Sequence, residues 1–126
     1  MKNIIYILSL SILLSFTNVL SARTGNEIFT NYCNTCHSPN MAAMFGAPAA
    51  HDKNAWDIRK DLAFKRAMEK GKFNDSDVSV KEKKILEALL ITAKEGTAKG
   101  MPPKGTCANC TDDELLDAIK YLSTTN

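Results

Sequence analysis

The residues with the clearest chemistry in this chain of 126 residues are Cys33, Cys36 and His37, which form a C-x-x-C-H run. Two cysteines at this spacing lie on one helical turn, so both can add to the vinyl groups of one porphyrin. The histidine that follows them brings an imidazole nitrogen to the porphyrin iron. The run therefore predicts one covalently attached haem c, with Cys33 and Cys36 as thioether donors and His37 as an axial ligand.

Two other kinds of site use a C-x-x-C pair. A thioredoxin-like redox pair needs a βαβ pattern around it, and the flanking sequence has none. A four-cysteine zinc site would add Cys107 and Cys110, but about 70 residues separate the two pairs, where compact zinc ribbons have about 15–20. The sequence favours haem attachment, and a non-haem thiol–disulfide oxidoreductase is the alternative.

The second axial ligand of such an iron is predicted to be Met101. Pro102 follows it directly and pushes its backbone into an extended form. Together, Pro102 and Pro103 stiffen the segment that follows. Met68 falls on a predicted helix face, where a methionine is more often part of the core. Met41 and Met44 follow the motif histidine too closely for the chain to reach the opposite side of the porphyrin.

Two further residues are predicted to lie against the haem or its ligand. Pro48 offers a carbonyl and no competing N–H, so we expect it to accept a hydrogen bond from the second ring nitrogen of His37. Trp56 is expected at the haem edge with its N–H free to meet a propionate, and packing in the core alone is the alternative. His51 lies in a polar stretch, which predicts a solvated surface histidine rather than a ligand.

Cys107 and Cys110 form a second C-x-x-C pair, followed by Thr111 instead of histidine, so they are not a second haem site. In an oxidising compartment a disulfide is the simpler fate of such a pair. It would stiffen the link between Met101 and the last helix. A redox-active disulfide is the alternative.

The first 22 residues have the layout of a signal peptide: Lys2, an apolar run over residues 4–16, and small residues up to Ala22. They predict export to the periplasm and a mature domain over residues 23–126. An uncleaved anchor is the alternative, because the uncharged run after Lys2 is 20 residues long, which is about the length of a spanning helix. No later segment approaches that length, so no stable membrane insertion is expected after cleavage.

The charge of residues 23–126 is nearly balanced, with 15 basic and 14 acidic side chains. This balance argues against nucleic acid and anionic membrane as partners. It predicts that a partner protein docks through a small apolar rim around the haem edge more than through electrostatic steering.

The same residues are predicted to be helical throughout, as one domain. Segments that open at Thr24, Ser79 and Thr111 each begin with a capping box and continue with apolar residues at helical spacing. Another helix is expected over residues 54–70, with a polar connector after it, and Gly96 is expected to stop the helix that opens at Ser79. No sustained alternating pattern occurs, so no strand is expected.

Together these residues resemble the class I cytochromes c, and more narrowly the cytochrome c-five type of bacteria. The resemblance covers nearly all of residues 23–126 and is most specific toward the end of the chain. The matching stretches are 33–37, 46–48, Asp52 with Trp56, 101–110 and the D-D-E-L opening of the last helix at 112–115. The stretch between Trp56 and Met101 is longer than the family pattern and contains the polar connector.

The resemblance implies an all-α fold in which helices wrap around one haem and the first and last helices cross near Gly25, Phe29 and Tyr121. It also implies two thioether cysteines, two axial ligands and one cysteine pair. These fall at Cys33 and Cys36, at His37 and Met101, and at Cys107 and Cys110.

The function expected from this resemblance is that of a periplasmic carrier of single electrons, not an enzyme. Its partners would be an upstream reductase or dehydrogenase and a downstream oxidase or reductase. An iron with both axial positions filled binds oxygen or peroxide poorly. The alternatives are a haem-based gas sensor and a peroxidase-like protein, in both of which Met101 would leave the iron easily.

Overall fold

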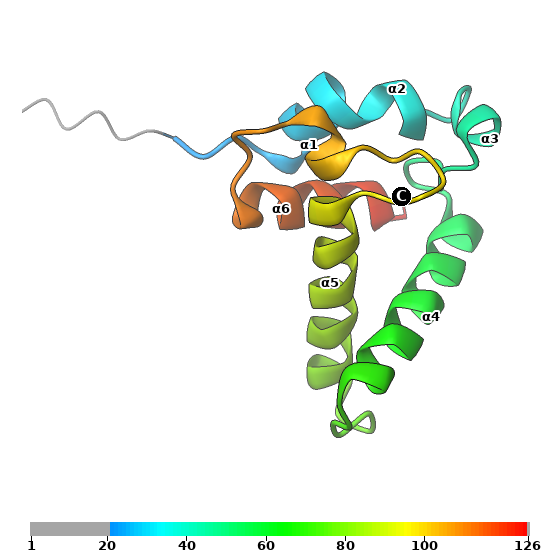
Figure 1. Ribbon diagram of the computed structural model, residues 1–126, viewed down its shortest axis with the longest axis vertical. Helices are drawn as coiled ribbons and strands as arrows, with labels where there is room; N and C mark the ends of the chain where they lie inside the picture. Colours follow the sequence, from blue (N-terminus) through cyan, green and yellow to red (C-terminus); the bar gives the residue numbers. More distant parts are fainter. Residues whose placement is uncertain (1–20, 126) are drawn as a thin grey trace, which may run out of the picture.

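The computed structural model describes residues 21–125, which form helices and loops with no strand among them. Figure 1 shows short helices above a long helical hairpin. This agrees with the predicted all-α class. The predicted signal peptide lies outside the described residues, apart from its last two positions. No helix of the described part is long and apolar enough to cross a membrane.

The chain begins with α1 (Gly25–Ile28), a π-helical turn (Phe29–Cys33) and α2 (Asn34–His37), which follow one another as one helical run. The hydroxyl of Thr24 accepts the N–H of Glu27, and the Glu27 carboxylate accepts the N–H of Thr24. The predicted capping box is therefore confirmed. It sets the start of the run that carries the C-x-x-C-H motif.

A single turn, α3 (Ala42–Phe45), leads into the hairpin of α4 (Lys53–Lys70) and α5 (Val78–Glu95), each 18 residues long. The helix expected over residues 54–70 is α4, which begins one residue earlier because Asp52 caps it. The residues between α4 and α5 form the loop at the foot of Figure 1. Gly96 ends α5, as predicted.

The predicted start of α5 is wrong. Asp77 is the N-cap, and its carboxylate accepts the N–H groups of Ser79 and Val80. Aspartate caps a helix as well as serine does, and Asp77 comes first along the chain. The helix therefore begins at Val78, before the capping box expected at Ser79 can form.

A 3-10 turn (Pro103–Thr106) and α6 (Asp112–Ser123) complete the fold. Thr111 and Glu114 form the predicted capping box of α6. The buried apolar side chains of this helix follow the helical repeat, and they are Leu115, Ala118, Ile119 and Leu122. Such a stripe has to be covered, which makes α6 the centre of the core.

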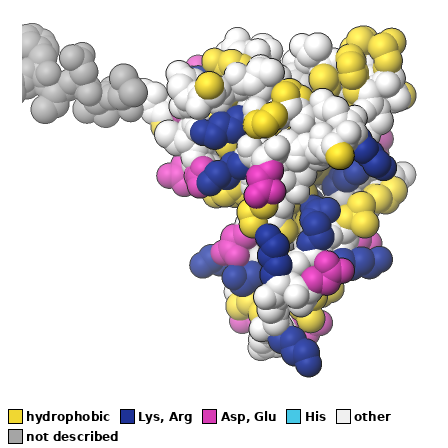
Figure 2. Space-filling model, viewed as in Figure 1, with side chains coloured by type: hydrophobic (Ala, Val, Ile, Leu, Met, Phe, Trp, Pro, Cys, Tyr) yellow, Lys and Arg dark blue, Asp and Glu magenta, His cyan; other side chains and the backbone are white. Residues whose placement is uncertain are grey.

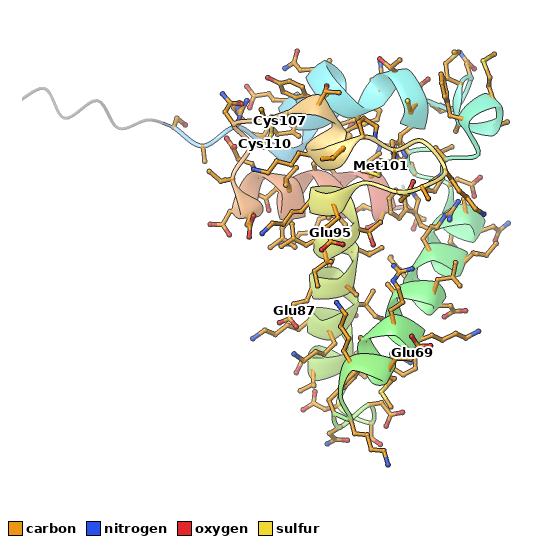
Figure 3. All side chains as sticks on the ribbon, viewed as in Figure 1. Glu69, Glu87, Glu95, Met101, Cys107 and Cys110 are labelled. Atoms are coloured by element: carbon orange, nitrogen blue, oxygen red, sulfur yellow. A yellow bond between two sulfur atoms is a disulfide. The ribbon has the colours of Figure 1, made fainter. Side chains whose placement is uncertain are left out.

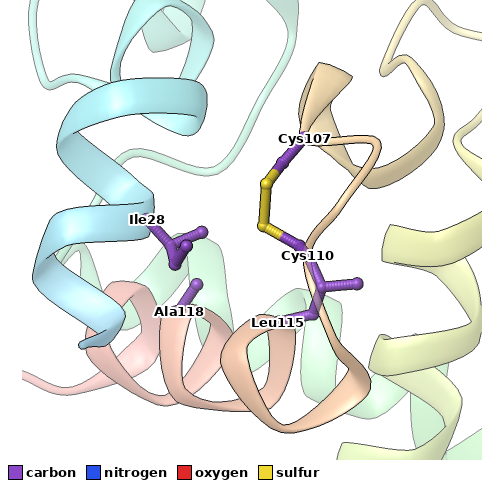
Figure 4. Close-up of a cluster of buried hydrophobic side chains, with 5 residues drawn as sticks. All are labelled: Ile28, Cys107, Cys110, Leu115 and Ala118. Carbon is purple, nitrogen blue, oxygen red and sulfur yellow. A yellow bond between two sulfur atoms is a disulfide. The ribbon is translucent and has the colours of Figure 1, made fainter. Parts of the chain in front are cut away.

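The first and last helices cross where the family resemblance implies. A Cβ added to Gly25 would overlap the carbonyl oxygen of Asp117, so only glycine permits this approach. The rings of Phe29 and Tyr121 pack with their centroids 5.4 Å apart. Beside the crossing, Ile28 packs against side chains of α6 and the cysteine pair (Figure 4).

Two further clusters bury the rest of α6. One joins Ala63 of α4 and Leu89 and Ala93 of α5 to Ile119. The other joins Trp56 to Leu122. The hairpin is thus held to α6 through its upper half, and its loop end extends away from the core (Figure 1).

Candidate haem site

Cys33 and Cys36 are free, half-buried thiols where the π-helical turn meets α2. Cys33 packs against two of the three buried clusters. Burial, and to a smaller extent the nearby Cys36, raises the pKa of Cys33 to about 11. A redox-active C-x-x-C pair attacks as a thiolate of lowered pKa, so the raised pKa of Cys33 does not favour the oxidoreductase alternative.

His37 is buried, with 8% of its surface exposed, and its ring is held in one orientation. Nδ1 lies 2.8 Å from the carbonyl oxygen of Pro48. Since a carbonyl can only accept, Nδ1 carries the proton and Nε2 keeps a free lone pair. Burial lowers the pKa of His37 and the charge of Arg59 adds to this, although the Pro48 contact opposes it. The site therefore presents a neutral imidazole suited to bind a metal.

Trp56 packs behind this histidine, with ring centroids 6.4 Å apart and nearly parallel planes. Its Nε1–H donates to the carbonyl oxygen of Ala49 at 2.9 Å, and the side chain is buried. The prediction of a free indole N–H is therefore wrong, because the loop that supplies Pro48 folds back over α4. Trp56 instead fixes the loop that orients His37.

His51 also differs from its prediction as a solvated side chain. It is half-buried, its Nδ1 donates to the carbonyl oxygen of Thr124 at 2.8 Å, and it meets the Tyr121 ring edge-on. It ties the loop after Pro48 to the end of α6. No local pattern could indicate this, since its partner lies 73 residues away.

Arg59 is a site residue that no sequence motif indicates. Its guanidinium donates to the carbonyl oxygen of Gly46 at 3.0 Å and joins α4 to the end of α3. The only signal was its position one helical turn after Trp56. Large apolar side chains on these two helices stay exposed, and they are Met44, Phe45, Ile58 and Leu62. They offer apolar surface of the kind that a porphyrin covers.

Met101 is half-buried in the loop after α5 and packs against the cluster that contains Ala63 and Ile119. Thr97 holds its backbone on both sides: the Thr97 hydroxyl accepts the Met101 N–H at 3.2 Å, and the Thr97 N–H donates to the Met101 carbonyl at 2.9 Å. Gly96 has a φ of +74°, and an added Cβ would overlap the Met101 carbonyl oxygen. Gly96 therefore positions the Met101 backbone as well as ending α5.

The segment after Met101, which carries Cys107 and Cys110, runs beside the first helical run of the chain (Figure 3). Pro102 is extended, and Lys104, Gly105 and Thr106 all have positive φ. Lys104 Nζ donates to the carbonyl oxygen of Cys110 at 3.0 Å, which closes this tight turn. A Cβ on Gly105 would lie 3.8 Å from the sulfur of Cys33, so the loop rests on a motif cysteine.

A disulfide joins Cys107 to Cys110, with Cα atoms 5.4 Å apart, inside the cluster of Figure 4. Both cysteines are almost fully buried. The cysteines of the haem motif are not part of this pair. Among residues 21–125, no group of three or more His, Cys, Asp or Glu side chains is placed to hold a metal ion, so the four-cysteine zinc arrangement does not form.

Arg23 and Glu114 form an ion pair that local sequence patterns do not indicate. Nε and one terminal nitrogen of Arg23 donate to the two carboxylate oxygens at 2.9 and 2.8 Å, and the Arg23 backbone N–H donates to the carboxylate at 3.0 Å. The Glu114 side chain is only 7% exposed. The same guanidinium lies 3.6 Å from the sulfur of Cys110. The pair fastens the start of the described chain to α6 and the disulfide.

The donor set fits haem. It consists of two free thiols for the vinyl groups, an imidazole with a free Nε2, and a thioether on a fixed loop.

Comparisons with known proteins agree with this chemistry. A family model described as "Cytochrome C oxidase, cbb3-type, subunit III" matches residues 20–122. Cytochrome c5 of Azotobacter vinelandii is 35% identical over 102 residues, which cover 81% of this chain and 94% of that protein. Cytochrome c5 of Ectopseudomonas mendocina is also 35% identical over 102 residues, covering 81% of this chain and 90% of that protein.

Proposed function

We propose that this chain, which belongs to the cytochrome c family as a monohaem electron carrier of the c5 type, works in the periplasm without enzymatic turnover. Its haem iron would be held by His37 and Met101. Bound haem supplies a one-electron ferric–ferrous couple. The polypeptide attaches the group, orients its ligands and keeps other ligands away.

The observation that carries this proposal is the contact between His37 Nδ1 and the Pro48 carbonyl at 2.8 Å. It leaves Nε2 as the only ring nitrogen available to iron, directly after two free thiols. Trp56 and Ala49 hold the loop that provides the carbonyl. A histidine held this way cannot rotate away from the iron without breaking a buried hydrogen bond.

Met101 as the second ligand is supported by the way its loop is built. Thr97 holds the N–H and the carbonyl of Met101, Gly96 lies against the same carbonyl, and the tight turn over 102–106 follows directly. Such a thioether would keep oxygen, peroxide and carbon monoxide off the iron. We therefore infer that the protein exchanges electrons with redox partner proteins and performs no substrate chemistry.

The periplasm is proposed as the compartment on the basis of the leader-like residues 1–22 and the cysteines. Cys107 and Cys110 are paired while Cys33 and Cys36 stay free. A stable disulfide suits an oxidising compartment. Haem attachment then uses the two thiols that the disulfide leaves available.

The test is to express the full chain in a host that attaches haem in the periplasm and to compare two double variants. Each removes one C-x-x-C pair: Cys33→Ala with Cys36→Ala, and Cys107→Ser with Cys110→Ser. The first should lose all pigment that survives acidified acetone and the mass of one haem, whereas the second should keep both. Loss of covalent haem from the second variant alone would contradict the proposal. Rapid carbon monoxide binding by the ferrous wild-type protein would favour the gas-sensor alternative.

A further inference from the structure

The net charge hides an uneven distribution between two parts of the molecule. Residues 53–95, which form the α4–α5 hairpin, hold eleven basic and eight acidic side chains, whereas the rest of residues 23–126 hold four basic and six acidic. The loop half of the hairpin is the most basic part, with seven basic and four acidic side chains between residues 65 and 84. Figure 2 shows Lys and Arg side chains along the hairpin, with acidic and apolar side chains between them.

A groove of about 260 Å³ lies between α4 and α5 in that half. Its apolar lining consists of Ala67, Phe73, Ala88 and Ile91. Phe73 packs edge-on against Phe64 at 5.9 Å, so this wall of the groove is preformed. A second hollow of about 150 Å³ shares Ala88 and Ile91 with it, so the apolar strip continues along α5.

The rim of the groove is cationic. Lys70, Lys72 and Lys84 line it, and its only acidic residue is Glu87, which is already paired with Lys84 at 2.8 Å. Lys70 and Lys72 form no ion pair with the described residues. Lys81 lies over the Phe64 ring at 4.6 Å and adds positive charge beside the groove. An apolar strip between unpaired cations is complementary to carboxylates that flank a large apolar side chain.

We propose that this groove docks an acidic segment of a redox partner protein, with a large apolar side chain in the strip and carboxylates on Lys70 and Lys72. The proposal rests on the proposed function as an electron carrier. It also revises the expectation, drawn from net charge, that a partner docks through an apolar rim more than through electrostatic steering, because the net charge of the hairpin exceeds that of residues 23–126 as a whole.

The groove lies away from the haem site, so it binds the partner protein but does not itself transfer electrons to it. Trp56, which packs on His37, and Lys70 are 14 residues apart on α4. At 1.5 Å per residue this corresponds to about 21 Å. Occupancy of the groove should therefore change how fast and how tightly a partner binds, and leave the haem spectrum and potential unchanged.

The test uses ¹⁵N-labelled, haem-loaded protein and a blocked peptide of four glutamates around one phenylalanine. Amide shift changes should be confined to residues 67–73 and 84–91. The dissociation constant should be on the order of 1 mM at ~10 mM ionic strength, and several-fold weaker at ~150 mM, where the screening length falls to about 8 Å. A peptide with serine in place of phenylalanine should bind more weakly.

Charge reversal provides the matched control. Lys70→Glu with Lys72→Glu should weaken peptide binding at least about tenfold, whereas Lys65→Glu with Lys83→Glu, which reverses two charges of the same half of the hairpin outside the groove, should change it less than about twofold. Equal effects of both changes, no shifts at all, or binding to phosphatidylglycerol vesicles but not to the peptide would overturn the proposal. The haem spectrum and potential are recorded on the same samples. Normal haem without peptide binding refutes the groove alone, whereas absence of a reversible haem couple refutes the electron carrier and the docking site with it.

Discussion

The haem end of the molecule and the loop end of the α4–α5 hairpin are stabilised in different ways. At the haem end, the two ends of the described chain meet: Gly25 touches α6, Arg23 pairs with the buried Glu114, and the disulfide lies between them. At the loop end, residues 70–79 are exposed except for Phe73, which is half-buried. Long-range contacts dominate the first region, and solvated side chains dominate the second.

The difference separates two tasks. A metal ligand must keep its geometry, and the two proposed ligands are held accordingly: His37 by its hydrogen bond to the Pro48 carbonyl, and the Met101 backbone by Gly96, where an added Cβ would overlap it. A surface that recognises a partner needs charged side chains that solvent and partner can reach, and the loop half of the hairpin has them. Substitutions should therefore be costly at the first region and mild at the second.

The largest effect should follow Met101→Ala. Loss of the thioether should abolish the weak far-red sulphur-to-ferric band and lower the potential by more than about 100 mV, within the roughly 0.8 V that axial ligands span. A redox titration followed by visible absorbance measures both. Met68→Ala is the control, because Met68 is a half-buried methionine of α4, and it should change neither. The reverse pattern would move the ligand to Met68.

Substitution of two glycines, each at the end of a helix, compares the stability of the two regions directly. Gly96→Ala places a Cβ on the Met101 carbonyl at a φ of +74°, and should cost roughly 2 kcal/mol or more and weaken the far-red band. Gly71 ends α4 in an extended conformation with nothing within 4 Å of an added Cβ. Gly71→Ala should stay within about 0.5 kcal/mol of wild type. Urea unfolding measures both, and similar losses would mean that the two ends are equally constrained.

Removal of the disulfide tests the stabilisation of the haem end alone. Closing so short a loop contributes about 2 kcal/mol by chain entropy, so Cys107→Ser with Cys110→Ser should lose about that much. The same unfolding experiment with a reductant should lower wild type to the level of the variant. A wild-type protein insensitive to reductant would show that the pair is not oxidised in solution.

The smallest effect is expected from Arg23→Ala, which should lower Tm by roughly 5 °C at about pH 7. Hydrogen bonds from the Arg23 guanidinium, then from the Thr111 and Arg23 N–H groups, hold the pKa of Glu114 well below its usual range. Because the folded pKa is the lower one, this stabilisation is present above the unfolded pKa of about 4.3 and is lost as pH falls below it.

The Tm difference between wild type and Arg23→Ala should therefore shrink between about pH 4 and about pH 2. Thermal unfolding across this range measures it. Lys94→Ala is the control, because it removes the ion pair between Lys94 and Asp112, which has the same 2.8 Å length as the pair between Arg23 and Glu114. Both of its side chains are largely exposed, so Tm should change by less than about 1 °C. A difference for Arg23→Ala that does not depend on pH would exclude the Glu114 carboxylate as its cause.

Local sequence patterns were enough to predict haem chemistry and most of the helices. The C-x-x-C-H run, the prolines after Met101, and the capping boxes at Thr24 and Thr111 are local patterns, and local backbone preferences are enough to interpret them. The prediction failed at Ser79, because Asp77 and Ser79 can both cap a helix within one turn and Asp77, which comes first, is the N-cap.

The contacts that hold the site in place depend on residues far apart in the sequence. Trp56 turns its N–H to Ala49, His51 ties its loop to Thr124, and Arg23 reaches Glu114 across 91 residues of sequence. Each contact joins residues that no helical repeat relates, and each becomes favourable only after α1 and α6 have crossed. The groove of the hairpin is a similar case, since its lysines are ordinary surface residues until α4 and α5 pair. Long-range contacts depend on the whole chain closing on itself, which a local pattern does not encode.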